Sequence, residues 1–180
     1  MNSASTLEFA LVGLLRQKAQ SGYDLRKTFT ETAMRHYSDS PGSIYPALKR
    51  LRARGWIEAE PKDSRGREVF HLSNEGVTAL AEWLSRDIKR EDVVFRVAEL
   101  MLRFAFMDGN VPRSTTTRFL EQFQLELGIY VRELRGRFER TCFQKPVHTG
   151  LLAFQHGVEA MEAQLSWAQK ARRTLEEDVR

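Results

Sequence analysis

Basic side chains gather in one short stretch of this 180-residue sequence, SPGSIYPALKRLRARGWI at positions 40–57. Tyr45, Lys49 and Arg52 are spaced by four and three residues, which places them on one face of a helix. Arg50 lies beside this face, and the helical part of the stretch contains no Asp or Glu. A solvated helix usually mixes charges, because opposite charges four residues apart stabilise it. The unmixed basic face therefore indicates a polyanionic partner, and we infer nucleic acid.

The opposite face of the same helix is apolar. Its members recur at helical spacing and must be buried; they are Ile44, Ala47, Leu48 and Leu51. A helix with this pattern is held by its apolar stripe and presents its basic side outward. Trp56 and Ile57 then resume the chain as an apolar strand.

The ends of this helix carry their own signals. Ser40 before a proline predicts an N-cap, and Gly55 predicts a left-handed stop. Pro46 allows two interpretations: it lies inside the helix and faces Gly42, whose backbone is the least constrained, or the helix begins near Ser43 with Pro46 in its first turn. In both cases small residues at the start can offer backbone N–H groups to a phosphate.

Two shorter helices are predicted before it. Ser5 with Glu8 and Ser21 with Asp24 both fit the capping-box pattern at a helix start. The first helix is predicted to run to about residue 18 and the second to about residue 34. Three short helices of which the last is basic are the order of a helix-turn-helix.

A hairpin is predicted after the basic helix. WIEAEP at 56–61 and EVFHL at 68–72 alternate or pair as strands, and KDSRGR lies between them. Lys62, Arg65 and Arg67 surround Gly66, which suits a wing that follows a phosphate backbone or enters the minor groove. A solvated hairpin loop is the alternative. We favour the wing because a basic helix directly precedes it.

These segments together resemble one family. The strings SGYDLRK at 21–27, GSIYPALKRLRARGWIEAE at 42–60 and FHLSNEG at 70–76 are similar to PadR transcriptional regulators. The resemblance is close over roughly the first half of the chain, and the later helices resemble more loosely the subclass with a virulence-activator-type α-helical C-terminal domain. In the second strand of the hairpin the sequence departs from the family pattern at Glu68, Val69, Phe70 and Ser73.

The pattern and the resemblance together give a set of candidate DNA-binding residues. The basic helix is expected to enter the major groove, where side chains near its start read bases and the cations hold the register through phosphates or guanine edges. The candidates are Tyr23, Ser40, Ser43, Tyr45, Lys49, Arg50, Arg52, Lys62, Arg65 and Arg67.

The second half of the chain predicts long helices. Ser73 is expected to cap a helix that runs toward residue 90 as a continuous connection, with a domain boundary near residue 88. One apolar helix is predicted over 92–107. A long second helix is predicted to open at Pro112 and to carry an apolar stripe from Phe119 to Phe138, and a third helix follows Pro146. The third carries a stripe with steps of three and four in which Arg172 is the one polar residue; its apolar members are Leu151, Phe154, Val158, Met161, Leu165, Ala168 and Leu175.

This stripe suits helix association. Packing on the preceding helices of the same chain is the alternative, and we expect both, because three long helices carry more apolar surface than a small intramolecular layer buries. PadR proteins are dimers through this region, so the resemblance implies a homodimer. The predicted fold is mainly α with a small β-hairpin wing: a winged helix-turn-helix over 1–88 and an α-helical dimerisation domain over 89–180.

Composition and charge agree with a globular DNA-binding protein. The chain is 42% hydrophobic and 29% charged, which is ordinary for a folded domain. Residues 1–90 hold 15 Lys and Arg against 11 Asp and Glu, whereas residues 91–180 hold 13 of each. The positive excess lies in the half with the basic helix. No signal peptide or membrane span is apparent, and a cytoplasmic location without membrane contact is expected.

The sequence contains no residue pattern typical of an enzyme active site or a metal site. The four histidines are scattered, and no phosphate-binding glycine loop occurs. Cys142 is the single cysteine, which excludes an internal disulfide, and it is expected to be a small core residue. We therefore predict no catalytic activity, no cofactor and no metal. The second half is rich in aromatic residues, which at helical spacing are expected to be core.

The sequence thus predicts a homodimeric DNA-binding transcriptional regulator, a repressor rather than an activator, acting on a double-stranded inverted-repeat operator. A small-molecule effector, with a pocket near the junction of the two halves, is implied by the resemblance alone. One alternative is a winged-helix module that binds a protein partner and not DNA. Another is an enzyme or metal sensor of related winged-helix type.

Overall fold

The computed structural model describes residues 4–32, 41–61, 66–142 and 147–177. The chain divides after Leu84 into two compact units, residues 1–84 and 85–180, which we call the N-terminal and C-terminal units. The domain boundary near residue 88 stays a prediction. Each unit is described by itself.

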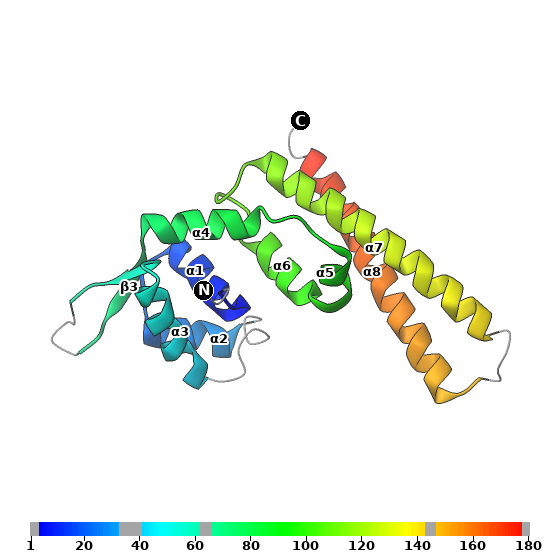
Figure 1. The fold of residues 1–180 in the computed structure, drawn as a ribbon, viewed down its shortest axis with the longest axis horizontal. Helices are drawn as coiled ribbons and strands as arrows, with labels where there is room; N and C mark the ends of the chain where they lie inside the picture. Colours follow the sequence, from blue (N-terminus) through cyan, green and yellow to red (C-terminus); the bar gives the residue numbers. More distant parts are fainter. Residues whose placement is uncertain (1–3, 33–40, 62–65, 143–146, 178–180) are drawn as a thin grey trace. The chain divides into compact units, whose positions relative to one another are not determined.

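The N-terminal unit combines helices with a small sheet (Figure 1). In chain order its elements are α1 (Thr6–Gln17), β1 (Gln20–Ser21), α2 (Gly22–Glu31), α3 (Pro41–Ala53), β2 (Ile57–Ala59), β3 (Val69–Leu72) and α4 (Asn74–Leu84). Three helices, a hairpin and a further helix are the order of a winged helix-turn-helix. The predicted mainly helical fold class with a small wing is confirmed.

Two capping boxes fix where α1 and α2 begin. The Ser5 Oγ accepts the Glu8 N–H at 3.2 Å, and the Glu8 carboxylate accepts the Ser5 N–H at 3.0 Å. Ser21 and Asp24 repeat this exchange at 3.2 and 3.3 Å. Each box satisfies backbone donors that a helix start leaves without partners. Both predicted helix starts are confirmed.

The sheet has three antiparallel strands in the order β1-β3-β2. Ile57 pairs with Leu72 in the predicted hairpin, which is confirmed. On the other edge of β3, Gln20 pairs with Phe70. The sequence analysis missed β1, because two residues are too short to show an alternating pattern and only their pairing with β3 makes them a strand.

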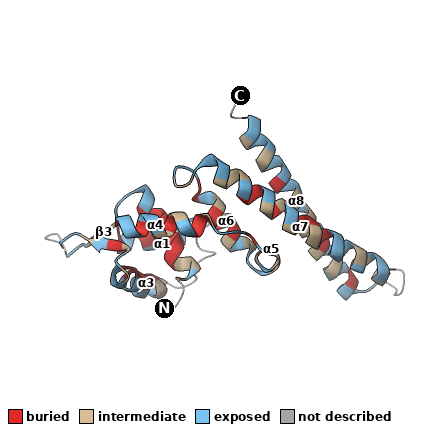
Figure 2. Cartoon of the chain, turned by 45° about the horizontal axis from the view of Figure 1, so that its top comes forward, coloured by how far each residue is buried: buried red, intermediate tan, exposed pale blue. Residues whose placement is uncertain are grey.

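The core of the N-terminal unit forms around α1, whose residues 8–15 are all buried (Figure 2). The Phe9 ring stacks on the Trp83 ring of α4 with centroids 4.5 Å apart, and it also meets the Trp56 ring at 5.7 Å. Leu25 and Phe29 bring α2 into the same core. These contacts join the helix-turn-helix to the helix that follows the hairpin.

A tight junction connects the end of α3 to the start of α4. Gly55 has φ +72°, which confirms the predicted left-handed stop. The Ser73 Oγ accepts the Gly76 N–H at 3.1 Å and donates to the Gly55 carbonyl at 2.6 Å. A Cβ atom placed on Gly76 would lie only 2.2 Å from the Trp56 carbonyl oxygen. The backbones therefore approach as closely as they do because residue 76 has no side chain.

The connection after α4 is not helical, so the predicted continuous helix to residue 90 is wrong. α4 ends at Leu84, and side chains from later helices bind the backbone that follows. Arg118 donates to the Ser85 carbonyl at 3.1 Å, Arg103 donates to the Arg86 carbonyl, and the Ile88 N–H donates to Gln122 Oε1 at 3.0 Å. These bonds replace the helical hydrogen bonds of the segment.

The predicted single helix over 92–107 is also wrong. The chain forms α5 (Arg90–Phe95) and α6 (Val97–Ala105), which are separated at Arg96. Arg96 has φ −131° and ψ 28°, outside the helical region. Val93 on α5 and Leu100 and Leu102 on α6 are all buried on either side of the break.

Two long helices, α7 (Arg113–Cys142) and α8 (Thr149–Glu177), lie side by side in the C-terminal unit (Figure 1). Gln124 Nε2 donates to the Ala168 carbonyl at 2.9 Å, and the Phe138 ring meets the Phe154 ring edge-on at 5.6 Å. Early residues of α7 thus meet late residues of α8, and the two helices are antiparallel. Cys142, at the end of α7, is exposed, so its expected core position is wrong.

The stripe predicted for association packs on α7 of the same chain. Leu151, Val158 and Ala168 are buried, and Phe154, Met161, Leu165 and Leu175 are half-buried. The intramolecular packing that the sequence analysis expected is therefore present. The role of this stripe in binding a second copy stays a prediction.

The junction around Gly76 yields a stability prediction. Gly76→Ala should lower the free energy of unfolding by about 1–3 kcal/mol, because the new methyl group overlaps the Trp56 carbonyl. Gly157→Ala in α8 is the control, since a Cβ there meets nothing within 4 Å and alanine favours the helix by about 1 kcal/mol. Urea unfolding of both variants measures the difference. A Gly76→Ala protein as stable as the wild type would contradict the close approach.

Candidate nucleic-acid interface

The third helix divides into the two faces that its sequence predicts. Its buried face holds Ile44, Ala47, Leu48 and Leu51. Tyr45, Lys49 and Arg52 are exposed on the other side. Because α1 and α2 pack against the buried face, the basic side has to point outward.

The start of this helix favours one of the two interpretations of Pro46. The helix begins at Pro41 and contains Pro46 in its interior, four residues after Gly42. The proline ring faces the carbonyl of Gly42, where the backbone is the least constrained, and the helix continues to Ala53. Ser40, the predicted N-cap, lies outside the described residues.

Arg50 is anchored to the core of the unit. Its Nε donates to the Oε1 atom of Glu8 in α1, whose side chain is 2% exposed, while 52% of the Arg50 side chain remains exposed. Glu8 thus receives one charged donor from α3 and one backbone donor from Ser5. A buried carboxylate needs such partners. Arg50 therefore both compensates Glu8 and reaches the surface of α3.

Two further arginines connect the strand β3 to the helices. Arg52 Nη1 lies 3.2 Å from the Glu68 carboxylate at the base of β3, and Arg67 pairs with Asp24 in α2. The Ser21 hydroxyl, with Arg67 alongside, lowers the pKa of the Asp24 carboxyl below its usual value. Asp24 therefore stays ionised near neutral pH and holds Arg67 beside α2.

The two exposed tyrosines flank a hollow on this side of the unit. Tyr23 is 65% exposed and Tyr45 is 53% exposed. The hollow has a volume of about 560 Å³ and is lined by Ser21, Gly22, Tyr23, Tyr45, Gly66, Arg67, Glu68 and Phe70. A Cβ atom on Gly22 would lie 2.8 Å from the Tyr45 ring, so the glycine lets this ring lie against the start of α2.

The structure brings most of the described candidate residues to this one side. Tyr23 and Tyr45 border the hollow with Arg67, and Arg52 reaches Glu68 at its edge. Ser43 is half-buried near the start of α3, and Lys49 is exposed without an ion pair in the described part of the chain. Lys62 and Arg65, like Ser40, lie outside the described residues.

Sequence reasoning missed four residues that position these candidates: Glu8, Gly22, Asp24 and Glu68. Glu8 and Asp24 carried a local signal as capping-box acids, but their arginine partners are 42 and 43 residues away in the sequence. Glu68 showed only as a departure from the family pattern. Arg54, next to the basic face, lies over the Trp56 ring at 5.4 Å.

The described residues were also compared with the requirements of a metal site and of a membrane span. No group of three His, Cys, Asp or Glu side chains in this part of the chain could hold a metal ion. His71 contacts Glu58 at 3.2 Å on the exposed surface of the hairpin. Across the same described ranges, none of the helices has the length and hydropathy that a bilayer crossing requires.

The fold and this face define the class of protein. A winged helix-turn-helix whose third helix is backed by apolar residues and carries exposed cations binds nucleic acid. Residues 11–82 match the family model described as Transcriptional regulator PadR-like family. Residues 11–82 therefore form a PadR-like domain, and the chain is a DNA-binding transcriptional regulator.

Known proteins of similar length align with nearly the whole chain. The Negative transcriptional regulator PadR of Bacillus subtilis (strain 168) is 25% identical over 182 residues, which cover 96% of this chain and 98% of that protein. A crystal structure of Bacillus subtilis PadR in complex with operator DNA has 23% identity and a TM-score of 0.45, covering 96% and 99% of the two chains. A second, in complex with p-coumaric acid, has the same identity and TM-score and covers 98% of each chain.

The buried carboxylate of Glu8 yields a second prediction. Glu8→Gln should lower the free energy of unfolding by about 1–3 kcal/mol, because the Ser5 N–H and Arg50 bind different carboxylate oxygens and an amide replaces one of these acceptors with an NH2 donor. Glu60→Gln, at an exposed position of the same unit, is the matched control and should change stability little. Urea unfolding of the two variants measures this difference in stability as a difference between their midpoints. Equal midpoints would show that the Glu8–Arg50 bond does not hold α3 on α1.

Proposed function

We propose that the protein represses transcription as a homodimer bound to an inverted-repeat operator. The helix α3 enters the major groove, and the hairpin of β2 and β3 flanks it as a wing. The observation that carries this proposal is the two-sided α3, with an acid-free exposed side and an apolar side in the core. Two-fold symmetry of the dimer then requires two half-sites about one helical turn apart.

In this proposal, the role of each residue in DNA binding depends on its position along α3. Side chains near its start, including Ser43 and Tyr45, read base edges. Lys49, Arg50 and Arg52 hold the register through phosphates or guanine edges. Tyr23 and Arg67 contact the backbone beside the hollow. From the sequence alone, Ser40, Lys62 and Arg65 are included in the same surface.

A homodimer is supported by the C-terminal unit. Its large apolar side chains at exposed positions are Phe95, Leu125, Val147, Leu152 and Trp167. Exposed apolar groups of this size favour burial against another surface. We propose that α7 and α8, with the stripe from Leu151 to Leu175, contribute to the contact with a second copy.

Repression is the sign of regulation that we propose. The similar Bacillus subtilis protein is named a negative regulator, and a dimer seated on an operator can block transcription without further chemistry. We propose that the protein acts without catalysis and in the cytoplasm, where the DNA is accessible. A small-molecule effector that changes operator binding is part of the proposal.

A protein-interaction module without DNA binding is the second candidate. One observation favours it: Arg50, Arg52 and Arg67 are already paired with carboxylates of the same unit. Each pair reduces the charge that is available to a duplex. Lys49 has no ion pair with any residue that the structure describes, and α3 contains no acidic residue; both observations favour DNA instead.

A gel shift with genomic fragments and random competitor DNA separates the two candidates. Binding to DNA should fall steeply with salt, by roughly one log unit of affinity per log unit of salt for each phosphate neutralised. Footprinting of the selected fragments should show two symmetric half-sites, and sedimentation should show a dimer. A protein that is monomeric, or that ignores duplex DNA at low salt, would contradict the proposal.

The division of roles along α3 can be tested with two variants. Lys49→Ala should weaken binding to every duplex by several-fold and lower the salt slope by about one, because it removes a phosphate contact. Tyr45→Ala should instead change the ratio between operator and random DNA. Lys170→Ala in α8 removes the same charge from an exposed position and is the control. Identical losses from Lys49→Ala and Tyr45→Ala on both kinds of DNA would contradict this division.

A further inference from the structure

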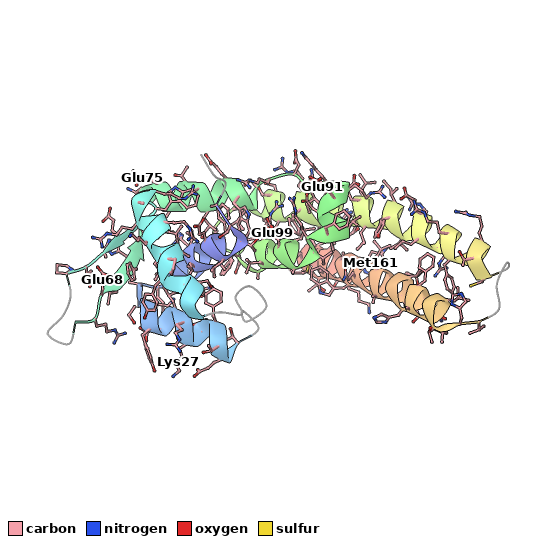
Figure 3. The ribbon with its side chains drawn as sticks, turned by 60° about the horizontal axis from the view of Figure 1, so that its bottom comes forward. Lys27, Glu68, Glu75, Glu91, Glu99 and Met161 are labelled. Atoms are coloured by element: carbon pink, nitrogen blue, oxygen red, sulfur yellow. The ribbon has the colours of Figure 1, made fainter. Side chains whose placement is uncertain are left out.

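We propose that Glu68 determines specificity for the operator. By pairing with Arg52, it weakens the contact between Arg52 and the phosphates of DNA that is not the operator. This inference rests on the proposed DNA-binding function and adds a residue that reduces binding to the wrong sequences. It assigns a role to an acid that pairs with an arginine of the basic helix. Glu68 lies beside the start of β3 (Figure 3).

The geometry places Glu68 within the candidate interface. Its Oε1 atom accepts a hydrogen bond from Arg52 Nη1 at 3.2 Å, across from α3 to the base of the wing. Glu68 also lines the hollow between Tyr45 and Arg67. The Glu68 side chain is 30% exposed and the Arg52 side chain 60% exposed, so an approaching duplex would meet both.

The charges around Glu68 come from three elements. Arg52 is on α3, and Arg67 precedes Glu68 in the chain but pairs with Asp24 of α2. Glu68 therefore has one close cationic partner among the described ion pairs, and that partner is a residue of the basic helix. Removing the Glu68 charge would free Arg52 without removing the partner of Arg67.

An arginine held by a carboxylate behaves differently from a mobile one. Its planar guanidinium is kept in one orientation, and the carboxylate occupies part of its donor fork. A phosphate that approaches Arg52 also approaches the negative charge of Glu68. Arg52 can then add little to a contact that depends on charge alone.

Binding to random DNA depends almost entirely on such charge contacts, whereas operator binding adds contacts to base edges. A carboxylate that weakens one phosphate contact therefore lowers the affinity for random DNA by a larger fraction than the affinity for the operator. At the operator, the remaining donors of Arg52 can still reach a base edge or phosphate while Glu68 holds the guanidinium in place. The consequence is a larger ratio between operator and random DNA.

A purely structural role for the same ion pair predicts another result. An exposed pair of this kind adds little to stability, so a structural role would give a small loss of stability and no gain in affinity. Glu68→Gln keeps the size and a hydrogen-bond acceptor while removing the charge. Glu82→Gln, at an exposed position of α4, removes the same charge from the same unit and is the control.

The experiment measures the affinity of the full-length protein for a selected operator fragment and for a random duplex over a range of salt. Glu68→Gln should raise affinity for the random duplex by several-fold, increase its salt slope by about one, and reduce the ratio between operator and random DNA. Glu82→Gln should leave the ratio and the slope unchanged. Both variants should keep the thermal midpoint of the wild type.

A second background tests whether Glu68 acts through Arg52. In an Arg52→Gln protein, the further change Glu68→Gln should leave the salt slope unchanged, since residue 52 then has no charge for Glu68 to pair with. An equal change of slope in both backgrounds would overturn the inference. So would equal behaviour of Glu68→Gln and Glu82→Gln while the wild type binds its operator. Failure of the wild type to bind any duplex would overturn the proposed function itself.

Discussion

The burial of one side of α3 is the constraint on which the rest of the structure depends. Ile44, Ala47, Leu48 and Leu51 are nearly inaccessible, and this fixes the rotation of the helix about its own axis. A rotation that exposed these side chains would cost about 1.5–3 kcal/mol for each large residue. The direction of the basic side is therefore set by the core. Glu8 adds a polar restraint, because Arg50 has to stay where it can reach that buried carboxylate.

Three arginines of the interface, Arg50, Arg52 and Arg67, are held by carboxylates. Glu8, Asp24 and Glu68 each bind an arginine of α3 or of the wing base, and each carboxylate comes from a different element. Such pairs fix side chains that would otherwise be mobile, which lowers the ordering cost of recognition. They also lower the net charge of the face. The arrangement suits a protein that must distinguish one site among many rather than bind all DNA tightly.

Local patterns in the sequence were sufficient for the starts of α1 and α2 and for the two faces and the end of α3. The capping boxes at Ser5 and Ser21, the stripe of α3 and the stop at Gly55 are decided by residues within one or two turns of one another. The resemblance of residues 21–76 to PadR proteins predicted the wing and the order of the elements. The candidate side chains on α3 followed from helical spacing alone.

The features that the sequence did not reveal depend on distant partners. The strand β1 exists because β3 pairs with it, and α4 stops at Leu84 because side chains of α6 and α7 bind the backbone of residues 85–88. The break at Arg96 likewise lies within a continuous apolar pattern. The arginine–carboxylate pairs join residues 16 to 43 positions apart. Spacing rules describe neighbours within one element and carry no information about such pairs.

The central claim is that the exposed side of α3 faces the DNA, and a tethered cleavage reagent tests it most directly. In a Cys142→Ser background, an iron chelate is attached to a cysteine at Tyr45 or, as a control, at Glu82 on α4, which lies across α1 from α3 (Figure 1). The account predicts cuts from position 45 that cluster within two symmetric half-sites, with only background cleavage from position 82. Equal cleavage from both positions, or none from position 45 on DNA that the protein binds, would contradict it.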